Sequence, residues 1–284
     1  MSFSRVEDTH FPKNRYIRIQ DKLMDLSIPR VMGIVNLTPD SFFTDSRKKN
    51  DNQLLKEVEQ MIVDGADFID IGGYSTRPNA ESVSEKEEIQ RVLEPIQKIR
   101  KTFPFIPISL DTFRGKVAEI GFNEGVDLIN DISGFQYDPT MLSVLEKIRL
   151  PYVLMHVNEA KQNMHKTVQN ELLFREMVHY FSEKIRQLND RGLTDIIIDP
   201  GFGFSKTMEQ NYTLVKQLDL FQLLERPILV GFSRKSMIYK KLNCTPEEAL
   251  NGTSILNTRA IIKGASILRV HDVKAAKEVL ALTI

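Results

Sequence analysis

The sequence of 284 residues has a single cysteine, Cys244, and no excess of charge of either sign. One cysteine excludes a disulfide within the chain and a zinc site built from several cysteines, and a free thiol is typical of a reducing cytoplasm. Lys plus Arg and Asp plus Glu number 38 each, so no net charge favours nucleic acid or an anionic membrane. We therefore expect a cytoplasmic protein with neither of these as a partner.

Long hydrophobic runs are also missing. No segment approaches the roughly 18 apolar residues of a membrane span, and the first residues contain no apolar run of signal-peptide length. The chain has no Walker loop, no GxGxxG after its first expected strand and no GxSxG motif, which argues against three large enzyme classes.

Histidine is sparse and scattered. None of the five histidines forms a close-set pair of metal ligands, which argues against histidine-rich zinc catalysis. We expect His179 on a helix surface, whereas His156 ends an apolar run and suits a structural or a catalytic role equally. The five are His10, His156, His165, His179 and His271.

The chain does contain a repeated pattern: a short apolar run, a polar or glycine-bearing loop, and an amphipathic helical stretch. Mostly apolar short runs suit strands that are buried on both faces, as in a parallel sheet. Eight such units predict a single (β/α)8 barrel, with a doubly wound open sheet as the structural alternative. No linker divides residues 1–284, so we expect one domain. The runs are 31–36, 68–73, 106–111, 128–132, 152–157, 196–199, 228–231 and 266–271.

Helix boundary signals and an N-terminal arm accompany this pattern. Ser84 with Glu87 suggests a capping box, the segment 245–247 places a cap before a first-turn proline, and Asp272 could cap the last helix. Residues 1–30 lie outside the repeat, and 16–26 within them predict a hairpin that plugs the bottom of the barrel. Glycines fall where helices should end, at Gly65, Gly125, Gly192 and Gly264.

Polar side chains gather where the expected strands end. β/α barrels build their active sites at this carboxyl end of the strands. Arg269 and His271 are two residues apart on one strand, so they point the same way and form a cationic pair. The loops 72–78 and 231–236 suit anions, because one offers hydroxyls and a guanidinium and the other runs into a helix N-terminus. The strand-end residues are Asn36, Asp70, Asp111, Asn130, His156, Asp199, Ser233, Arg234, Lys235, Arg269 and His271.

Seven ordered motifs in this chain resemble the dihydropteroate synthases, from about residue 16 to the C-terminus. The DPGFGF and SRKS elements are the most diagnostic. The motifs are GIVNLTPDSF at 33–42, DIGG with STRP at 70–78, DT at 111–112, NDI at 130–132, DPGFGF at 199–204, GFSRKS at 231–236 and RVHD at 269–272.

This resemblance implies the reaction. A dihydropteroate synthase joins 6-hydroxymethyl-7,8-dihydropterin pyrophosphate to p-aminobenzoate, releasing pyrophosphate and 7,8-dihydropteroate for folate biosynthesis. It implies dissociative substitution at the pterin methylene carbon, with Mg²⁺ as cofactor, sensitivity to sulfonamides, and a homodimer formed through the late helices. Residues 1–30 would be the arm and hairpin of one pterin-binding barrel domain.

The resemblance also implies residue roles. Catalytic roles fall to Asn36, Asp40, Arg269 and His271, and Asn36 would be the metal ligand. The pyrophosphate would contact Asn36, Thr76, Arg269 and His271. The p-aminobenzoate would contact Phe42, Thr76, Arg77, Pro78 and Ser236. The pterin would contact Asp111, Asn130, Met155, Asp199, Phe204, Gly231, Lys235 and Arg269.

Two departures from the family pattern stand out. Tyr74 occupies a position where glutamate is expected, and segment 158–164 lacks the usual glycine and proline. Two alternative functions remain at this point: a pterin-binding methyltetrahydrofolate–corrinoid methyltransferase, and a non-catalytic pterin-binding paralogue. The presence of both expected anion loops, and of Asn36, Lys235 and Arg269, favours the synthase.

Overall fold

The computed structural model describes residues 15–37, 47–74, 83–157 and 172–284, except for the side chains of 47–51. Within these ranges, eight parallel strands form one sheet in the order β8-β7-β6-β5-β4-β3-β10-β9, and a parallel bridge between Ile198 and Ile228 joins its two ends. The sheet is therefore a closed barrel, as predicted, and the open-sheet alternative is wrong. The strands are β3 (Arg30–Asn36), β4 (Phe68–Gly72), β5 (Ile108–Asp111), β6 (Leu128–Asp131), β7 (Tyr152–Met155), β8 (Ile196–Asp199), β9 (Leu229–Val230) and β10 (Ile267–Val270).

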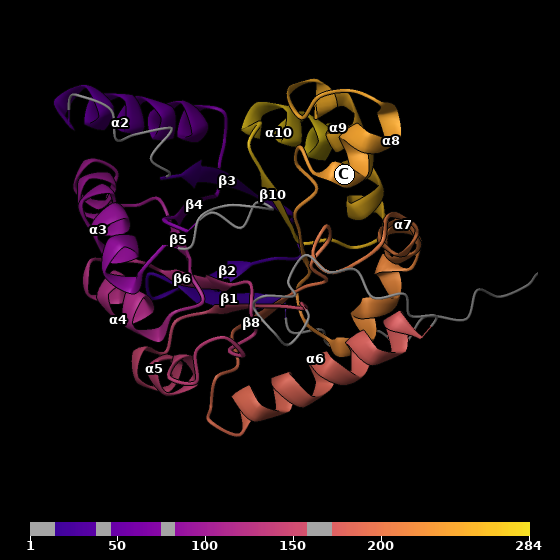
Figure 1. Ribbon diagram of the computed structural model, residues 1–284, viewed down its shortest axis with the longest axis horizontal. Helices are drawn as coiled ribbons and strands as arrows, with labels where there is room; N and C mark the ends of the chain where they lie inside the picture. The colour runs from indigo at the N-terminus through magenta and orange to yellow at the C-terminus, as the bar shows by residue number, and fades with distance from the viewer. Residues whose placement is uncertain (1–14, 38–46, 75–82, 158–171) are drawn as a thin grey trace, which may run out of the picture.

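Helices surround this barrel on the outside (Figure 1). They alternate with the strands along the chain, which gives the β/α repeat that the sequence predicts. They are α2 (Arg47–Val63), α3 (Glu85–Thr102), α4 (Gly115–Asn123), α5 (Met141–Ile148), α6 (Leu173–Asn189), α7 (Met208–Lys216), α8 (Ser236–Leu242), α9 (Leu250–Ile262) and α10 (Val273–Thr283), with the short 3-10 helices η2 (Leu218–Leu224) and η3 (Glu247–Ala249).

Each strand alternates between the helix layer and the barrel interior. In β4, Ile69 and Ile71 belong to the large core cluster under the helices, whereas Phe68 belongs to a second cluster inside the barrel. The two-residue period of a strand then directs Asp70 into the barrel as well, one level above Phe68. Since this alternation recurs around the barrel, the strand sequences themselves place polar groups at one end of the interior.

The N-terminal hairpin closes the opposite end. Strands β1 (Tyr16–Ile19) and β2 (Lys22–Asp25) pair antiparallel, and the turn residues Gln20 and Asp21 have φ of 48° and 59°. These values suit a tight hairpin turn. The hairpin contributes Ile17, Ile19 and Leu26 to an apolar cluster with inward-facing residues near the start of the strands. The predicted plug is therefore confirmed. The strand residues of this cluster are Met32, Phe68, Leu128, Val153, Ile197, Leu229 and Ile267.

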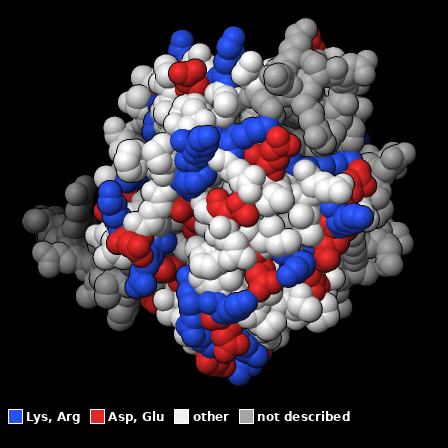
Figure 2. Space-filling model, turned by 90° about the vertical axis from the view of Figure 1, so that its left-hand side faces the viewer, with Lys and Arg blue, Asp and Glu red and all other residues white. Residues whose placement is uncertain are grey.

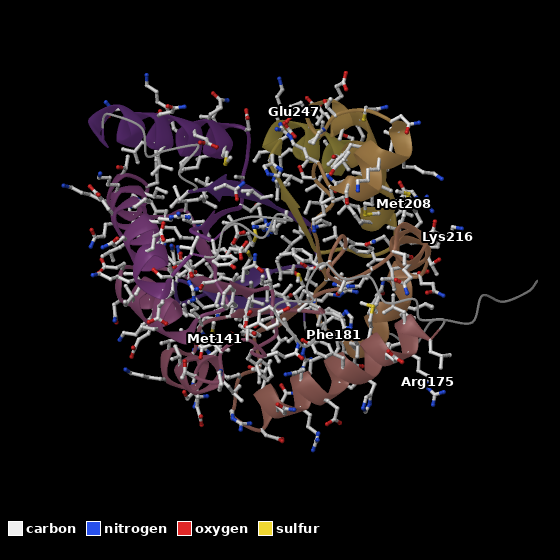
Figure 3. The ribbon with its side chains drawn as sticks, viewed as in Figure 1. Met141, Arg175, Phe181, Met208, Lys216 and Glu247 are labelled. Carbon is white, nitrogen blue, oxygen red and sulfur yellow. The ribbon has the colours of Figure 1, made fainter. Side chains whose placement is uncertain are left out.

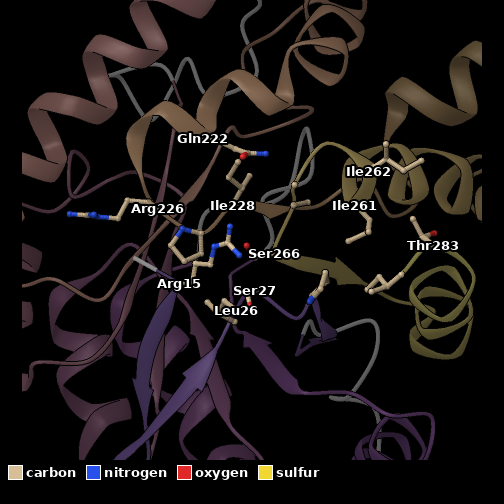
Figure 4. A pocket seen from close by; sticks show the side chains of 15 residues that line it. Arg15, Leu26, Ser27, Gln222, Arg226, Ile228, Ile261, Ile262, Ser266 and Thr283 are labelled. Atoms are coloured by element: carbon tan, nitrogen blue, oxygen red, sulfur yellow. The ribbon is translucent and has the colours of Figure 1, made fainter. Parts of the chain in front are cut away.

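A pocket of about 330 Å³ lies at this same end, beside the hairpin (Figure 4). It is lined by Leu26 and Ser27, by Arg226 before β9, and by Ser266 before β10. It includes none of the predicted site residues, because those follow the strands rather than precede them.

The predicted helix ends are mostly right. Ser84 caps α3, accepting from the Glu87 amide at 3.2 Å. Asp272 stands at the N-cap position of α10, but its carboxylate accepts from Arg234 at 2.8 Å instead of capping that helix. Thr207 and Gln210 form a capping box for α7 that the sequence analysis did not identify. The four glycines all have φ between 71° and 96°, namely Gly65, Gly125, Gly192 and Gly264.

The outer surface mixes both signs of charge. Over the face that turns toward the viewer in Figure 2, Lys and Arg are interspersed with Asp and Glu, which fits the zero net charge. Helix α6 shows how the helices divide their faces. Phe181 is fully buried against the barrel, and Arg175 is exposed at the outer end of the same helix (Figure 3). Among the described helices, none has the length and apolar character needed to cross a membrane.

Candidate active site

Arg269 lies at the centre of the carboxyl end of the barrel, which we call the mouth, where it bridges two carboxylates from other strands. Its Nε donates to Asp70 at 2.6 Å and its Nη2 donates to Asp111 at 2.7 Å. Burial opposes the charge on Arg269, but Asp70 and Asp111 more than offset this and raise its pKa. Burial also raises the pKa of Asp111 to about 7, against the opposing effect of Arg269.

Asp70 on β4 accepts hydrogen bonds from side chains of three other strands. Besides Arg269 on β10, Ser109 Oγ on β5 donates at 2.5 Å, and Asn130 Nδ2 on β6 donates at 3.2 Å. The Asp70 side chain is fully buried. The sequence analysis counted Asp70 among the strand-end residues without giving it a role. An inward position flanked by outward Ile69 and Ile71 was the available signal.

A second group of charged side chains lies around Asp199, at the end of β8. Asp199 Oδ1 accepts from the Gly201 amide at 2.7 Å, and Lys235 Nζ donates to the Phe202 carbonyl at 2.5 Å. Burial raises the pKa of Asp199, while the nearby charges of Lys235 and Lys206 oppose that rise. Burial lowers the pKa of Lys235 to about 8, with Asp199 opposing. Asp199 and Lys235 are therefore two weakly solvated groups of opposite charge that stabilise each other's charged form.

Lys206 completes this group and was not predicted. It is buried, and its Nζ donates to the carbonyls of His156, Gly201 and Phe204 at 3.0–3.2 Å. Burial lowers its pKa to about 7. Since three carbonyls already take its three protons, Lys206 supports the backbone of the DPGFGF loop and leaves ligand contact to Lys235.

The remaining predicted polar residues lie at or just beyond the carboxyl ends of β3, β9 and β10. His271 Nδ1 lies 2.9 Å from Ser233 Oγ, and that oxygen also accepts from the His271 amide at 3.2 Å. Arg234 turns away from the mouth to pair with Asp272. Asn36 is exposed at the carboxyl end of β3, next to β10 in the sheet.

Apolar side chains form one wall of this end. Met155 is buried among Phe113, Ile132 and Val157, and Phe204 packs on the same cluster. Tyr74, the departure from the family pattern, packs edge-on against Phe113, with 5.2 Å between the ring centroids. The guanidinium carbon of Arg114 lies 5.5 Å from the Tyr74 ring centroid. The tyrosine therefore continues the apolar wall from the end of β4.

His156 is mostly enclosed, with its ring edge-on to Tyr180 at 5.0 Å. Its Nδ1 has no hydrogen-bond partner among the described residues. Burial lowers its pKa well below the ordinary histidine value, so the ring is neutral near pH 7. His179 is exposed, as expected.

Several predictions fall outside the described residues: Asp40, Phe42, Thr76, Arg77 and Pro78, and the atypical segment 158–164. Gly231 follows β9, and Ser236 is the first residue of α8, directly after Lys235. Around the described part of the mouth, the structure thus brings together the predicted polar and apolar groups from β5 to β8, β10 and the loop after β9.

Comparison with known proteins decides which family this site represents. The model for "pterin binding enzyme" matches residues 32–271. The chain belongs to the pterin-binding enzyme family. It is 45% identical to a dihydropteroate synthase of Clostridium beijerinckii, over 86% of this chain and 88% of that protein.

Solved structures agree with this membership. A structure of the Yersinia pestis dihydropteroate synthase with a sulfonamide drug complex covers 94% of this chain and 98% of its own, with 37% identity and a TM-score of 0.87. A Xanthomonas albilineans dihydropteroate synthase with 4-aminobenzoic acid has 32% identity and a TM-score of 0.86, covering 94% and 96%. These likenesses extend over the barrel and the mouth together.

Proposed function

We propose that this family member is a dihydropteroate synthase. It would condense 6-hydroxymethyl-7,8-dihydropterin pyrophosphate with p-aminobenzoate to give 7,8-dihydropteroate and pyrophosphate, a step of folate biosynthesis. The observation that carries the proposal is the convergence of Asp111, Asn130, Asp199 and Lys235 on one end of a barrel whose relatives are dihydropteroate synthases.

Pterin recognition follows from the donors and acceptors at the mouth. A pterin ring carries alternating donors and acceptors in one plane, so it needs carboxylates, an amide oxygen and an ammonium around its edge. Asp111, Asn130 and Asp199 would meet the ring nitrogens and the amino group, and Lys235 its carbonyl oxygen. Met155 and Phe204 would form apolar walls, and Arg269 would lie over the ring. Such a site rejects analogues that leave its buried groups unpaired.

Pyrophosphate would lie at the outer side of this pocket, against Asn36, Arg269 and His271. Thr76 would add a contact from outside the described residues. The donor set also fits Mg²⁺, because an exposed amide oxygen is a hard ligand and Mg²⁺ keeps most of its waters beside diphosphates. We assign the metal contact to Asn36; within the described ranges, no cluster of three or more His, Cys, Asp or Glu could hold a metal. When bound there, Mg²⁺ would neutralise charge on the leaving pyrophosphate.

The chain's own groups then account for a dissociative reaction. Arg269 and His271 would stabilise the negative charge that builds on the departing pyrophosphate. Electrons from the pterin ring stabilise the methylene cation once the carbon–oxygen bond breaks. The aniline nitrogen adds to that carbon, and the anilinium so formed is acidic enough to give its proton to water or to the released pyrophosphate, so no strong base is required. Asp40 would steady the cation.

The p-aminobenzoate site would be formed by Phe42, Thr76, Arg77, Pro78 and Ser236. A turnover assay with both substrates tests the whole proposal, with release of pyrophosphate and formation of dihydropteroate as the readouts. Sulfonamides share the aniline and the para anionic group, so we expect competition with p-aminobenzoate. Methyl transfer from methyltetrahydrofolate to a corrinoid, or pterin binding without turnover, would support the alternative functions instead.

A homodimer is part of the proposal. Ile255 and Ile262 lie seven residues apart on α9, hence on one face, and are 53% and 72% exposed. Ile262 and the exposed Ile284 border the same pocket, which extends this apolar face onto the end of α10. Exposed apolar side chains gathered on one side of a molecule favour an interaction surface, and we propose a second copy of the chain as its occupant. Sedimentation analysis of Ile255→Lys should give a monomer, and a wild-type monomer at micromolar concentration would refute the dimer.

We also propose a cytoplasmic location, which the single free thiol of Cys244 supports. Fractionation of cells that express the protein would test it.

A further inference from the structure

Two buried carboxylates, one on β4 and one on β6, have very different partners. Asp131 on β6 accepts from the backbone amides of Ser133 and Phe135 and from the hydroxyl of Tyr152. These contacts hold the loop after β6 and are structural. By contrast, within the described residues the partners of Asp70 on β4 are three side chains, and two of them, Asn130 and Arg269, belong to the proposed pterin site.

From this contrast we propose that Asp70 is a positioning residue for pterin recognition. Its carboxylate determines which atoms of Asn130 and Arg269 face the substrate. The proposal rests on the proposed function, because it assigns a role within the same site.

The chemistry of the carboxylate decides how Asn130 is oriented. An ionised carboxylate only accepts hydrogen bonds, so only the amide nitrogen of Asn130 can face Asp70, at 3.2 and 3.4 Å from its two oxygens. The amide oxygen is then the atom that remains for the pocket. Asn130 therefore meets a ring donor, and a ring acceptor at that point would be rejected.

The same carboxylate fixes Arg269. Its Nε is held by Asp70 and its Nη2 by Asp111, and two contacts to separate carboxylates set the plane of the guanidinium. That plane is what allows Arg269 to lie over a flat ring while its remaining donors reach pyrophosphate. Without Asp70, the long arginine side chain would regain several rotamers and lose this preset plane.

The first test is Asp70→Asn, which keeps the size of the side chain. The asparagine lacks the negative charge that pairs with Arg269, and its amide nitrogen places a donor at one of the two positions that face the Asn130 amide nitrogen. We expect pterin affinity, measured by calorimetry, to fall about tenfold or more, since charge-assisted hydrogen bonds are involved. Turnover with saturating pterin should fall less than kcat/KM if ground-state positioning is the main loss.

Matched variants separate positioning from stability. Asp131→Asn removes the structural carboxylate and should lower the melting temperature while pterin affinity stays within about twofold of wild type. Ser109→Ala removes one donor to Asp70 without touching Asn130 or Arg269, so its effect on affinity should be smaller than that of Asp70→Asn. If Asp70→Asn loses stability like Asp131→Asn and binds pterin normally, Asp70 is only structural.

An exchange of the two side chains keeps the test decisive if Asp70→Asn folds poorly. Asn130→Asp alone places two carboxylates face to face and should weaken pterin binding about a hundredfold, because like charges are costly in a buried pocket. In the double variant Asp70→Asn with Asn130→Asp, the new amide donates to the new carboxylate, which still presents an oxygen to the ring. The pair should regain about tenfold or more of the lost affinity, and simple additivity of the two losses would overturn the proposal.

The fall of pterin affinity at low pH, which protonation of Asp111 should cause, gives a readout that a change in packing alone would not shift. Asp111 is surrounded by Arg269 from β10, Asp70 from β4, Glu88 from α3 and Asp131 from β6. Removing the Asp70 charge should lower the pKa of Asp111 and so shift this fall in affinity toward lower pH. If the wild-type protein fails to catalyse the condensation, the proposed function fails, but these pterin-binding comparisons still test whether Asp70 positions Asn130 and Arg269.

Discussion

The two ends of the barrel interior are built from the same strands yet differ in chemistry. At the amino end, Phe68, Leu128, Ile197 and Ile267 pack against the hairpin. Two residues later, the same strands place Asp70, Asn130, Asp199 and Arg269 at the carboxyl end. Because a strand turns alternate side chains to one face, the pairs point into the same space at different heights.

The contrast teaches that one strand can divide its work between stability and recognition. The apolar level is sealed by Ile17, Ile19 and Leu26 and excludes water. The polar level above it holds three carboxylates and three cations whose charges are balanced by hydrogen bonds and ion pairs, namely Asp70, Asp111, Asp199, Lys206, Lys235 and Arg269. Substitutions at the two ends should therefore separate stability from binding.

The largest effect on stability is expected at the amino end. Ile17→Ala removes a side chain that is 1% exposed, and it should lower the free energy of unfolding by about 2–5 kcal/mol. Urea unfolding measures this loss, and pterin affinity of the folded variant should not change. Leu23→Ala on the paired strand is the control, since Leu23 is 72% exposed. Equal losses from both would show that the hairpin does not plug the barrel.

The largest effect on binding is expected at the carboxyl end of β8. Asp199→Ala removes a buried carboxylate that would hold the pterin, which should cost about 1.5–3 kcal/mol or more of binding free energy. Calorimetry should then show little measurable affinity. Asp195→Ala, just before the same strand, removes a half-buried carboxylate from the amino end and should leave the affinity within about twofold. A normal affinity in Asp199→Ala would place the pterin elsewhere.

Lys235 and Lys240 give a smaller comparison on one helix. Lys235 lies at the N-cap of α8 beside Asp199, and Lys240 is exposed further along it. We expect Lys235→Ala to weaken pterin binding about tenfold or more, and Lys240→Ala to have no measurable effect. Similar losses in the two variants would mean that the pocket does not reach this junction.

The smallest expected effect appears on changing pH. The pKa of Asp111 is raised to about 7, so the group gains a proton below that pH and loses its full capacity to accept from the ring. Lys235, with a pKa of about 8, loses its charge above that value. Pterin affinity should therefore be greatest between these values and fall by less than about tenfold at one pH unit below the lower one. In Asp111→Asn the acid limb should disappear.

Much of this arrangement could be predicted from the sequence because strands and strand ends are local signals. The apolar runs, the hairpin and the glycines at helix ends are each determined by a few neighbouring residues. The motifs also placed Asp111, Asn130, Asp199 and Arg269 at the mouth. What they could not give were pairings across the barrel: Arg269 is 199 residues from Asp70, and its choice of partner depends on how strands meet.

The misassigned cap has the same origin. Asp272 has the right residue type and position to cap α10, and only the three-dimensional approach of Arg234 redirects its carboxylate. Lys206 likewise reads as a surface lysine in a loop, until three carbonyls from two loops enclose its ammonium group. Long-range pairing, rather than local propensity, limits what the sequence alone determines here.

The barrel is closed at one short seam. Between β8 and β9 the ladder consists of the bridge from Ile198 to Ile228, with the Ile198 amide donating to Pro227 at 2.9 Å. Next to that seam, Asp199 ends one strand and Lys235 follows the other, and their opposite charges interact. A pterin held by both side chains would span the weakest junction of the sheet. By linkage, ligand at a hundred times its Kd adds about 2.7 kcal/mol to the folded state, and here that energy would oppose the opening of the ring of strands.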